Sequence, residues 1–257
     1  MRPIRSFVDA ELIEGRQLEL DDRATAHLTR VLRRRVGDRI TLFDGRGKEA
    51  EAELITVERR GLCRVEIRTV VRVSRESPLR IELIQAIARG EKMDWVVQKA
   101  TELGVAAIRP VFTERGEVRA QGSALLRKQQ RWQEIAMGAC EQSGRNLLPM
   151  IHAPVALADL ATDAATRLML DPAGATMLGS AVSGEPGHAG STHVALAVGP
   201  EGGFGDQDRR LLQEAGFVAV MLGPRVLRTE TAGLAAISVL QLLLGDFDHP
   251  AALDCAS

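Results

Sequence analysis

Two turns that combine glycine with proline are the residues best suited to chemistry in this chain. "AVGPEGGFGDQD" (197–208) and "LGPRVLRTETAG" (222–233) each place a Gly-Pro pair directly after an apolar run. Proline fixes φ, and glycine lets the backbone approach a ligand closely. Open α/β sheets bind ligands at the carboxyl ends of their strands, so we expect the two turns to be facing walls of one pocket.

Three interpretations of this pocket compete. Gly-Pro pairs often do no more than end strands, so the turns can be purely structural. A phosphate cradle is the second, but the G-x-x-x-x-G-K-[ST] pattern is missing and Glu201 would repel a phosphate. The third is a backbone-lined site for a cofactor that is mostly neutral or cationic, and Glu201 favours that one.

An alternation of strands and helices must position the two turns. From Leu79 onward the pattern predicts an α/β fold, a parallel sheet covered by helices. The stretch 172–192 is rich in Gly, Ala and Ser, and we expect a loose surface connection there. The strands are expected at 79–88, 106–112, 167–171, 193–200 and 217–224, and the helices at 91–104, 123–143, 206–216 and 229–244.

The first 75 residues read instead as short strands interrupted by one helix at 21–33, which predicts a small β-barrel. They hold 17 Lys or Arg against 13 Asp or Glu, and the run "RVLRRRVGDR" (30–39) concentrates the positive charge. Both a solvated helix face and a nucleic-acid contact fit such a run.

Composition narrows the class of protein. A chain of 257 residues with a net charge of −1 does not coat nucleic acid through basicity alone. Its apolar runs are shorter than the roughly 20 residues needed to cross a bilayer, and "MRPIRSFVDA" lacks the apolar centre of a signal peptide, so we expect a cytoplasmic protein without a membrane segment. Cys63, Cys140 and Cys255 show neither disulfide nor zinc spacing, and no metal is expected.

Four motifs together resemble a known family. "EKMDWVVQKATELGV", "RW...IA..ACEQSGRN..P", "VGPEGGF" and "LGPRVLRTETA" are similar to the bacterial ribosomal RNA small subunit methyltransferase E family, of the SPOUT class of S-adenosylmethionine-dependent methyltransferases. The resemblance extends from residue 30 to residue 241. It implies a PUA-like RNA-binding barrel over 1–75 and a SPOUT methyltransferase domain over 76–250, whose chain end passes through a loop as a trefoil knot, an exceptional feature.

The activity implied by the resemblance is N3-methylation of one uridine in 16S rRNA, near the decoding centre of the small subunit. Leu222 and Leu227 would flank the adenine of S-adenosylmethionine, and main chain of the turns would hydrogen-bond it. By similarity, the residues that line the cofactor site are Gly199, Pro200, Glu201, Gly202, Gly203, Leu222, Gly223, Leu227 and Thr229.

The reaction needs a group that takes the N3 proton and a cation for the charge that develops on the uracil oxygens. Glu201 and Glu230 are candidates for the proton acceptor, and Arg228 for the cation. Glu230 also lies in the first turn of the last helix, where an acidic residue stabilises the helix dipole without any catalytic role.

RNA contacts are expected from positively charged and loop residues, since phosphate contacts dominate affinity. They are Arg5, Arg30, Arg33, Arg34, Arg145 and Asn146. SPOUT enzymes typically pair through the last helix, so the resemblance also implies a C₂ homodimer. A non-catalytic RNA-binding factor for ribosome assembly is the alternative function, and a nucleotide hydrolase is disfavoured because no phosphate-binding lysine follows the glycine turn.

Overall fold

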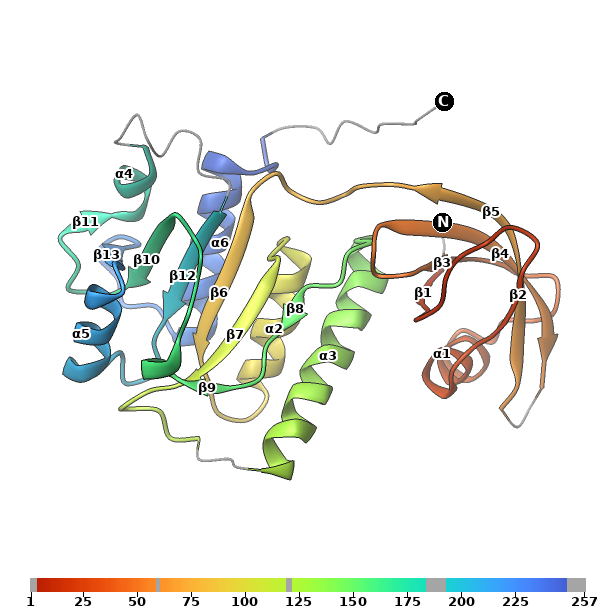
Figure 1. The fold of residues 1–257 in the computed structure, drawn as a ribbon, viewed down its shortest axis with the longest axis horizontal. Helices are drawn as coiled ribbons and strands as arrows, with labels where there is room; N and C mark the ends of the chain where they lie inside the picture. Colours follow the sequence, from red (N-terminus) through yellow and green to blue (C-terminus); the bar gives the residue numbers. More distant parts are fainter. Residues whose placement is uncertain (1–3, 59–60, 119–121, 184–192, 249–257) are drawn as a thin grey trace. The chain divides into compact units, whose positions relative to one another are not determined.

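The chain folds into two compact units, each with its own hydrophobic core. The computed structural model describes residues 4–58, 61–118, 122–183 and 193–248 (Figure 1). Among the described residues, the first unit consists of those before Ser77 together with Cys140–Leu148, and the second of Ser77–Ala139 and the residues from 149 to 248. The segment Cys140–Leu148 thus joins a unit from which it is distant in sequence.

The first unit is built on a five-stranded sheet with the order β1-β3-β4-β5-β2. β1 and β3 are parallel and the other neighbours antiparallel. In β4 the side chains of Ala50, Ala52 and Leu54 are buried, and this alternation directs one face of the strand into the core. The strands are β1 (Arg5–Phe7), β2 (Gln17–Glu19), β3 (Arg39–Phe43), β4 (Lys48–Val57) and β5 (Cys63–Arg72).

The expected helix over 21–33 differs from the prediction in its second half. The Asp21 carboxylate accepts a hydrogen bond from the Ala24 N–H at 2.7 Å and starts α1 (Asp22–Ala26). A π-helix, η1 (His27–Val31), follows, and the helix ends there. Arg33 then adopts φ +51°, a left-handed conformation unusual for a residue with a side chain.

The second unit is built on an eight-stranded sheet whose neighbouring strands are all parallel. Its order is β11-β13-β10-β12-β6-β7-β8, with β9 paired to β7. This confirms the predicted α/β fold. The strands are β6 (Arg80–Ala86), β7 (Ala107–Phe112), β8 (Met150–Ile151), β9 (Val155–Ala156), β10 (Thr166–Leu170), β11 (Thr176–Met177), β12 (His193–Val198) and β13 (Val218–Met221).

Helices cover both faces of this sheet. Val194, Leu196 and Val198 of β12 pack in a core with residues of α2, α3, α4 and α6, whereas Ala195 and Ala197 of the same strand pack with residues of α5 and η2. Both faces are therefore buried, which explains the nearly continuous apolar sequence of β12. The helices are α2 (Lys92–Glu102), α3 (Ser123–Ser143), η2 (Leu157–Asp159), α4 (Leu178–Ser183), α5 (Asp206–Glu214) and α6 (Thr229–Leu244).

The prediction of a loose connection over 172–192 is wrong for its first half. β11 pairs with β13, and the short helix α4 follows at once. Leu178 and Val182, four residues apart on α4, are buried in the core that also contains α6. Composition concealed this, because two apolar residues are enough to fix one short helix. Residues 184–192 lie outside the described residues.

A buried glutamine of α6 ties together the beginning and the end of the second unit. The fully buried Gln241 donates to the Leu103 carbonyl at 2.9 Å and accepts from the Ser77 hydroxyl at 2.7 Å. Gly104 ends α2 with φ +87°, and a Cβ there would lie 2.8 Å from Gln241 Nε2. The glycine therefore provides both the left-handed turn and the space for the glutamine.

We expect Gly104→Ala to destabilise the second unit more than the matched variant Gly216→Ala. Gly216 follows α5 with φ +81°, and a Cβ there would make only an ordinary van der Waals contact. Gly216→Ala should therefore cost about 1 kcal/mol, from backbone strain alone. At Gly104 the displaced Gln241 should add about 1–3 kcal/mol for buried polar groups left without partners. Free energies of unfolding from denaturant titration test this, and equal losses would contradict it.

Candidate active site

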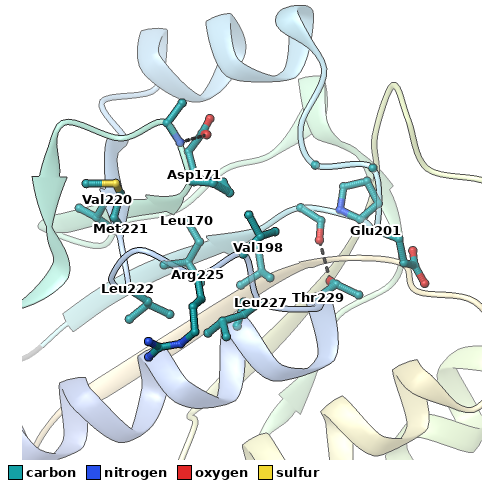
Figure 2. A pocket seen from close by; sticks show the side chains of 18 of the residues that line it. Leu170, Asp171, Val198, Glu201, Val220, Met221, Leu222, Arg225, Leu227 and Thr229 are labelled. Atoms are coloured by element: carbon teal, nitrogen blue, oxygen red, sulfur yellow. Dashed lines mark hydrogen bonds between the residues drawn. The ribbon is translucent and has the colours of Figure 1, made fainter.

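A cavity of about 400 Å³ lies at the carboxyl ends of three neighbouring strands, β10, β12 and β13 (Figure 2). The chain immediately after each strand contributes to its walls. In Figure 2, Glu201 lies at one end of the cavity beside Thr229, and Val220 and Met221 lie toward the other end. Both Gly-Pro turns line the cavity, as the sequence predicted, because parallel strands deliver their carboxyl ends to one edge of the sheet.

The first wall is the turn after β12. Gly203 has φ +67°, and its N–H donates to the Pro200 carbonyl at 2.9 Å, which closes the turn. A Cβ on Gly199 would come within 3.1 Å of the Phe204 nitrogen, so a side chain there would force the backbone to shift by a few tenths of an ångström. The shape of the turn thus favours glycine at both positions.

The second wall is the segment between β13 and α6. Gly223 has φ +102°, and half-buried Leu222 and Leu227 present apolar surface on either side of it. Arg225 and Val226 of the same segment also line the cavity and are exposed. This wall therefore offers apolar contacts together with main-chain groups around a glycine.

One buried hydroxyl joins the two walls. Thr229, the first residue of α6, donates to the Gly199 carbonyl at 2.6 Å (Figure 2). The same hydroxyl accepts from the Gln85 side-chain amide of β6 at 3.0 Å. Gly233, one turn further along α6, lies close to Val198, and a Cβ there would meet that side chain at 3.3 Å. The start of α6 is thereby held against the end of β12.

An acidic residue in the cavity wall was not predicted. Asp171 directly follows β10, is 6% exposed, and accepts from Arg209 Nε at 2.6 Å and from the Ala173 N–H at 2.9 Å. Burial raises the pKa of Asp171, but the hydrogen bonds from Arg209 and Ala173 outweigh it and lower the pKa below its ordinary value. The sequence did contain a sign of this site, because the predicted strand "RLMLD" ends in a carboxylate at the edge of the sheet where ligands bind.

Glu201 is held by a lysine of α2. Lys92 Nζ donates to Glu201 Oε1 at 2.8 Å and lies 3.8 Å from Glu230 Oε2. Burial raises the pKa of Glu201, but the hydrogen bond and charge of Lys92, together with backbone hydrogen bonds from Glu201 and Arg89, outweigh it and lower the pKa below its ordinary value. The two predicted proton acceptors therefore share one cation, and of the two Glu201 lines the cavity whereas Glu230 is not among its lining residues. Arg228, the residue before α6, is exposed and does not line the cavity.

All nine residues predicted for the cofactor line this cavity. Their binding of a cofactor stays a prediction. The sequence did not point to the remaining lining residues, which are Leu170, Asp171, Pro172, Ala173, Val198, Arg209, Val220, Met221, Arg225, Val226 and Ala232. Among the described residues there is no group of three or more His, Cys, Asp or Glu arranged to hold a metal, and no helix is both long and apolar enough to span a membrane.

Comparisons with known proteins agree with this architecture. Residues 75–241 match an RNA methyltransferase domain, and residues 20–67 match an RNA methyltransferase PUA domain. The ribosomal RNA small subunit methyltransferase E of Buchnera aphidicola (strain APS) is 30% identical over 95% of this chain and 94% of its own length. The enzyme of the same name from Bacillus subtilis is 32% identical over 86% of this chain and 89% of its own.

The chain belongs to the ribosomal RNA small subunit methyltransferase E family. Two solved structures support the assignment. One, from Neisseria gonorrhoeae, is a ribosomal RNA small subunit methyltransferase E bound to S-adenosyl methionine, with a TM-score of 0.85 and 41% identity. The other, from Legionella pneumophila, is described as a methyltransferase in complex with the bound cofactor SAM, with a TM-score of 0.89 and 42% identity. Both comparisons cover 96% of this chain and all of the other.

Three residues expected to contact RNA are buried in a polar network of the first unit. Arg5 pairs with Glu49 at 2.7 Å and donates to the Asn146 side-chain oxygen at 2.5 Å. Arg145 pairs with Glu76 at 2.5 Å, and Asn146 is 1% exposed. Direct RNA contacts by Arg5, Arg145 and Asn146 stay a prediction that this burial does not favour, because their polar groups are hydrogen-bonded inside the protein. Arg145 and Asn146 were expected in a substrate loop because they follow a long helix, and Arg5 was expected to contact phosphate from the barrel; only the fold shows that they are buried.

The arginine run has the opposite character. Arg30 and Arg33 are exposed, as are Arg35 and the neighbouring Val31 and Val36. Arg34 is half-buried, with Nη1 at 3.9 Å from Asp38. For a member of this family, Arg30 and Arg33 therefore stay available as RNA-binding candidates, and Arg34 is a weaker one.

The buried network makes the first unit sensitive to acid. Burial raises the pKa of Glu49, but hydrogen bonds from Arg75, Arg5 and Asn146 outweigh it and lower the pKa from 4.5 to about 2. A carboxylate with a depressed folded-state pKa stabilises the fold above its unfolded pKa. We expect about 2 kcal/mol from Glu49, lost as the pH falls from about 4.5 toward 2.

Hydrogen exchange of the β3, β4 and β5 amides measures this loss locally. Wild type should lose protection over that pH range, whereas Glu49→Gln should start less protected and change less. Glu51→Gln on the same strand is the control, since its exposed pair with Arg39 contributes little. Parallel pH profiles for wild type and Glu49→Gln would contradict the assignment.

Proposed function

We propose that this protein transfers a methyl group from S-adenosylmethionine to N3 of a specific uridine in 16S rRNA, in the decoding region of the small ribosomal subunit. The observation that carries the proposal is the cavity between the two Gly-Pro turns. Its lining includes every residue that the sequence analysis predicted for cofactor binding. Family membership supports the same activity, because the named relatives are methyltransferases of small-subunit ribosomal RNA.

The chemistry of the cavity suits this methyl donor. Its volume of about 400 Å³ falls in the usual range of small-molecule sites. Leu222 and Leu227 offer apolar surface for the adenine ring, and the bare main chain of Gly202 and Gly223 offers N–H and C=O groups to its polar edge. Acidic and basic side chains lie in the same walls and match a ligand that carries an ammonium, a sulfonium and a carboxylate. They are Asp171, Glu201, Arg209 and Arg225.

When bound, S-adenosylmethionine supplies an electrophilic methyl group on a positively charged sulfur. The protein has to hold the uridine in line with that methyl group, take the N3 proton, and stabilise charge on the uracil oxygens. Glu201 and Glu230 are the nearby carboxylates, and the exposed Arg228 is a cation that can reach a substrate from the start of α6. Arg30 and Arg33 would bind RNA phosphates.

Two linked measurements test the function. Calorimetry should detect binding of S-adenosylmethionine, and mass spectrometry of 16S rRNA from a strain lacking the gene should show loss of one N3-methyluridine that the purified protein restores. A non-catalytic assembly factor with structural glycine loops would bind no donor. Donor binding with unchanged N3-methyluridine in the deletion strain would leave a methyltransferase but reject this substrate.

The RNA-binding role of the arginine run has its own test. We expect Arg30→Gln combined with Arg33→Gln to weaken binding to 16S rRNA and to reduce the slope of log K against log salt by about 1.4, the value for two single-strand phosphate contacts. Affinity for S-adenosylmethionine should not change. The control is Arg64→Gln with Arg68→Gln, which removes the same charge from residues already paired with acidic side chains. Equal salt slopes for the two double variants would reject the assignment.

Three further features belong to the same proposal. We expect a C₂ homodimer that pairs through α6, whose Leu242 and Leu243 are exposed. We also expect a trefoil knot formed by the chain around the cavity, and a cytoplasmic location where ribosomes are assembled.

A further inference from the structure

Three charged side chains from three separate elements meet beside the cavity. Lys92 begins α2, Glu201 lies in the turn after β12, and Glu230 lies in the first turn of α6. The ammonium group of Lys92 is 2.8 Å from Glu201 Oε1 and 3.8 Å from Glu230 Oε2. One cation is thus shared by the two carboxylates that are candidates for the proton acceptor.

The position of Lys92 does not follow from helix stability. It is the first residue of α2, where the helix dipole disfavours a positive charge. Within the described part of the chain no side chain caps that end of the helix, and the backbone N–H of Lys92 donates to the Arg89 carbonyl at 3.3 Å. The ion pairs to the two glutamates are therefore what accounts for a lysine here.

The two carboxylates have different surroundings. Glu201 lines the cavity, has a 37% exposed side chain and accepts the hydrogen bond from Lys92. The Glu230 side chain is 17% exposed, and its Oε2 is buried without any hydrogen-bond partner among the described residues. A carboxylate oxygen in that state has an acceptor position to fill.

The different surroundings of Glu201 and Glu230 suit two different tasks in the reaction, attraction of a cationic ligand and acceptance of a proton. A carboxylate that already accepts a hydrogen bond from an ammonium group is stabilised in its ionised form and is a poor proton acceptor. It is well suited to attract a cationic ligand. The unfilled oxygen of Glu230, 3.8 Å from the same ammonium group, has charge compensation without a hydrogen bond that would have to break.

We propose that Lys92 is a positioning residue that assigns these tasks, holding Glu201 as the anion that faces the methyl donor and leaving Glu230 to take the N3 proton of the uridine. The inference rests on the proposed function and names which carboxylate acts in it. Lys92 touches neither the donor nor the uridine in this scheme and works through the two glutamates.

The uridine N3–H bond breaks, the proton moves to the Glu230 carboxylate, and the electron pair stays on nitrogen. That pair forms the new bond to the methyl carbon, while the electrons of the carbon–sulfur bond leave with sulfur and neutralise its charge. Glu230 then releases its proton to solvent, so the protein is unchanged after one turnover.

Paired variants of the two glutamates test the assignment. Small ribosomal subunits from the deletion strain serve as substrate, and calorimetry measures donor affinity separately. Glu230→Gln should lower kcat by about 10²–10⁴-fold with donor affinity unchanged. Glu201→Gln should weaken S-adenosylmethionine binding by about tenfold, with a far smaller loss of kcat at saturating donor than Glu230→Gln causes. The opposite pattern would overturn the proposal.

Variants of Lys92 test its role through the pH dependence of kcat/KM. Lys92→Gln removes a positive charge next to the carboxylates, so the acidic limb should move to higher pH, whereas Lys92→Arg should restore it toward wild type. Lys99→Gln is the control on the same helix, because Lys99 pairs with Glu102 instead. A loss of activity of equal size at every pH, not restored by arginine, would indicate a merely structural lysine and overturn the proposal.

The outcomes separate this inference from the proposed function. If wild type neither binds S-adenosylmethionine nor methylates the subunits, the function itself fails. If wild type does both and Glu230→Gln keeps full turnover, the function stands and only the division between the two glutamates fails.

Discussion

The hydrogen bond from the Thr229 hydroxyl to the Gly199 carbonyl is the contact on which the cavity depends. It joins the turn after β12 to the beginning of α6, and the Gln85 side chain of β6 donates to the same hydroxyl. Because these groups are buried, losing the Thr229 hydroxyl would take this donor from the Gly199 carbonyl and this acceptor from Gln85. The two walls are therefore fixed relative to one another before any ligand arrives, which reduces the entropy that binding must overcome.

Charge in this site follows from the same geometry. The ends of the strands and the start of α6 bring acidic side chains to one edge of the sheet. Each of them lies close to a basic side chain from another element. Asp171 is paired with Arg209, and Glu201 with Lys92. Since both carboxylates are held ionised, the cavity presents fixed negative charge to a cationic ligand. Glu230 differs because no described residue donates a hydrogen bond to its buried Oε2.

The sequence was informative where local rules decide the structure. Period and composition predicted the α/β fold, and the Gly-Pro turns located the cavity because parallel strands end at one edge. The sequence was uninformative where the burial and the partners of a side chain depend on residues that are distant in the chain. Arg145 and Asn146 look like loop residues, and only the neighbourhood of Arg5 and Glu76 reveals their burial. Asp171 as a wall of the cavity, the pairing of Lys92 with Glu201 and Glu230, and the helix α4 were missed for the same reason, since the partners lie far away in the chain.

The buried Gln241 has a consequence for how this protein is made. It completes the hydrogen bonds of Ser77 and Leu103, which precede it by well over a hundred residues. A nascent chain emerges from its amino-terminal end, so β6 and α2 leave the ribosome long before α6 exists to cover them. The second unit cannot reach its final packing until synthesis is nearly finished, and its earliest strand must wait, partly uncovered, for its last helix.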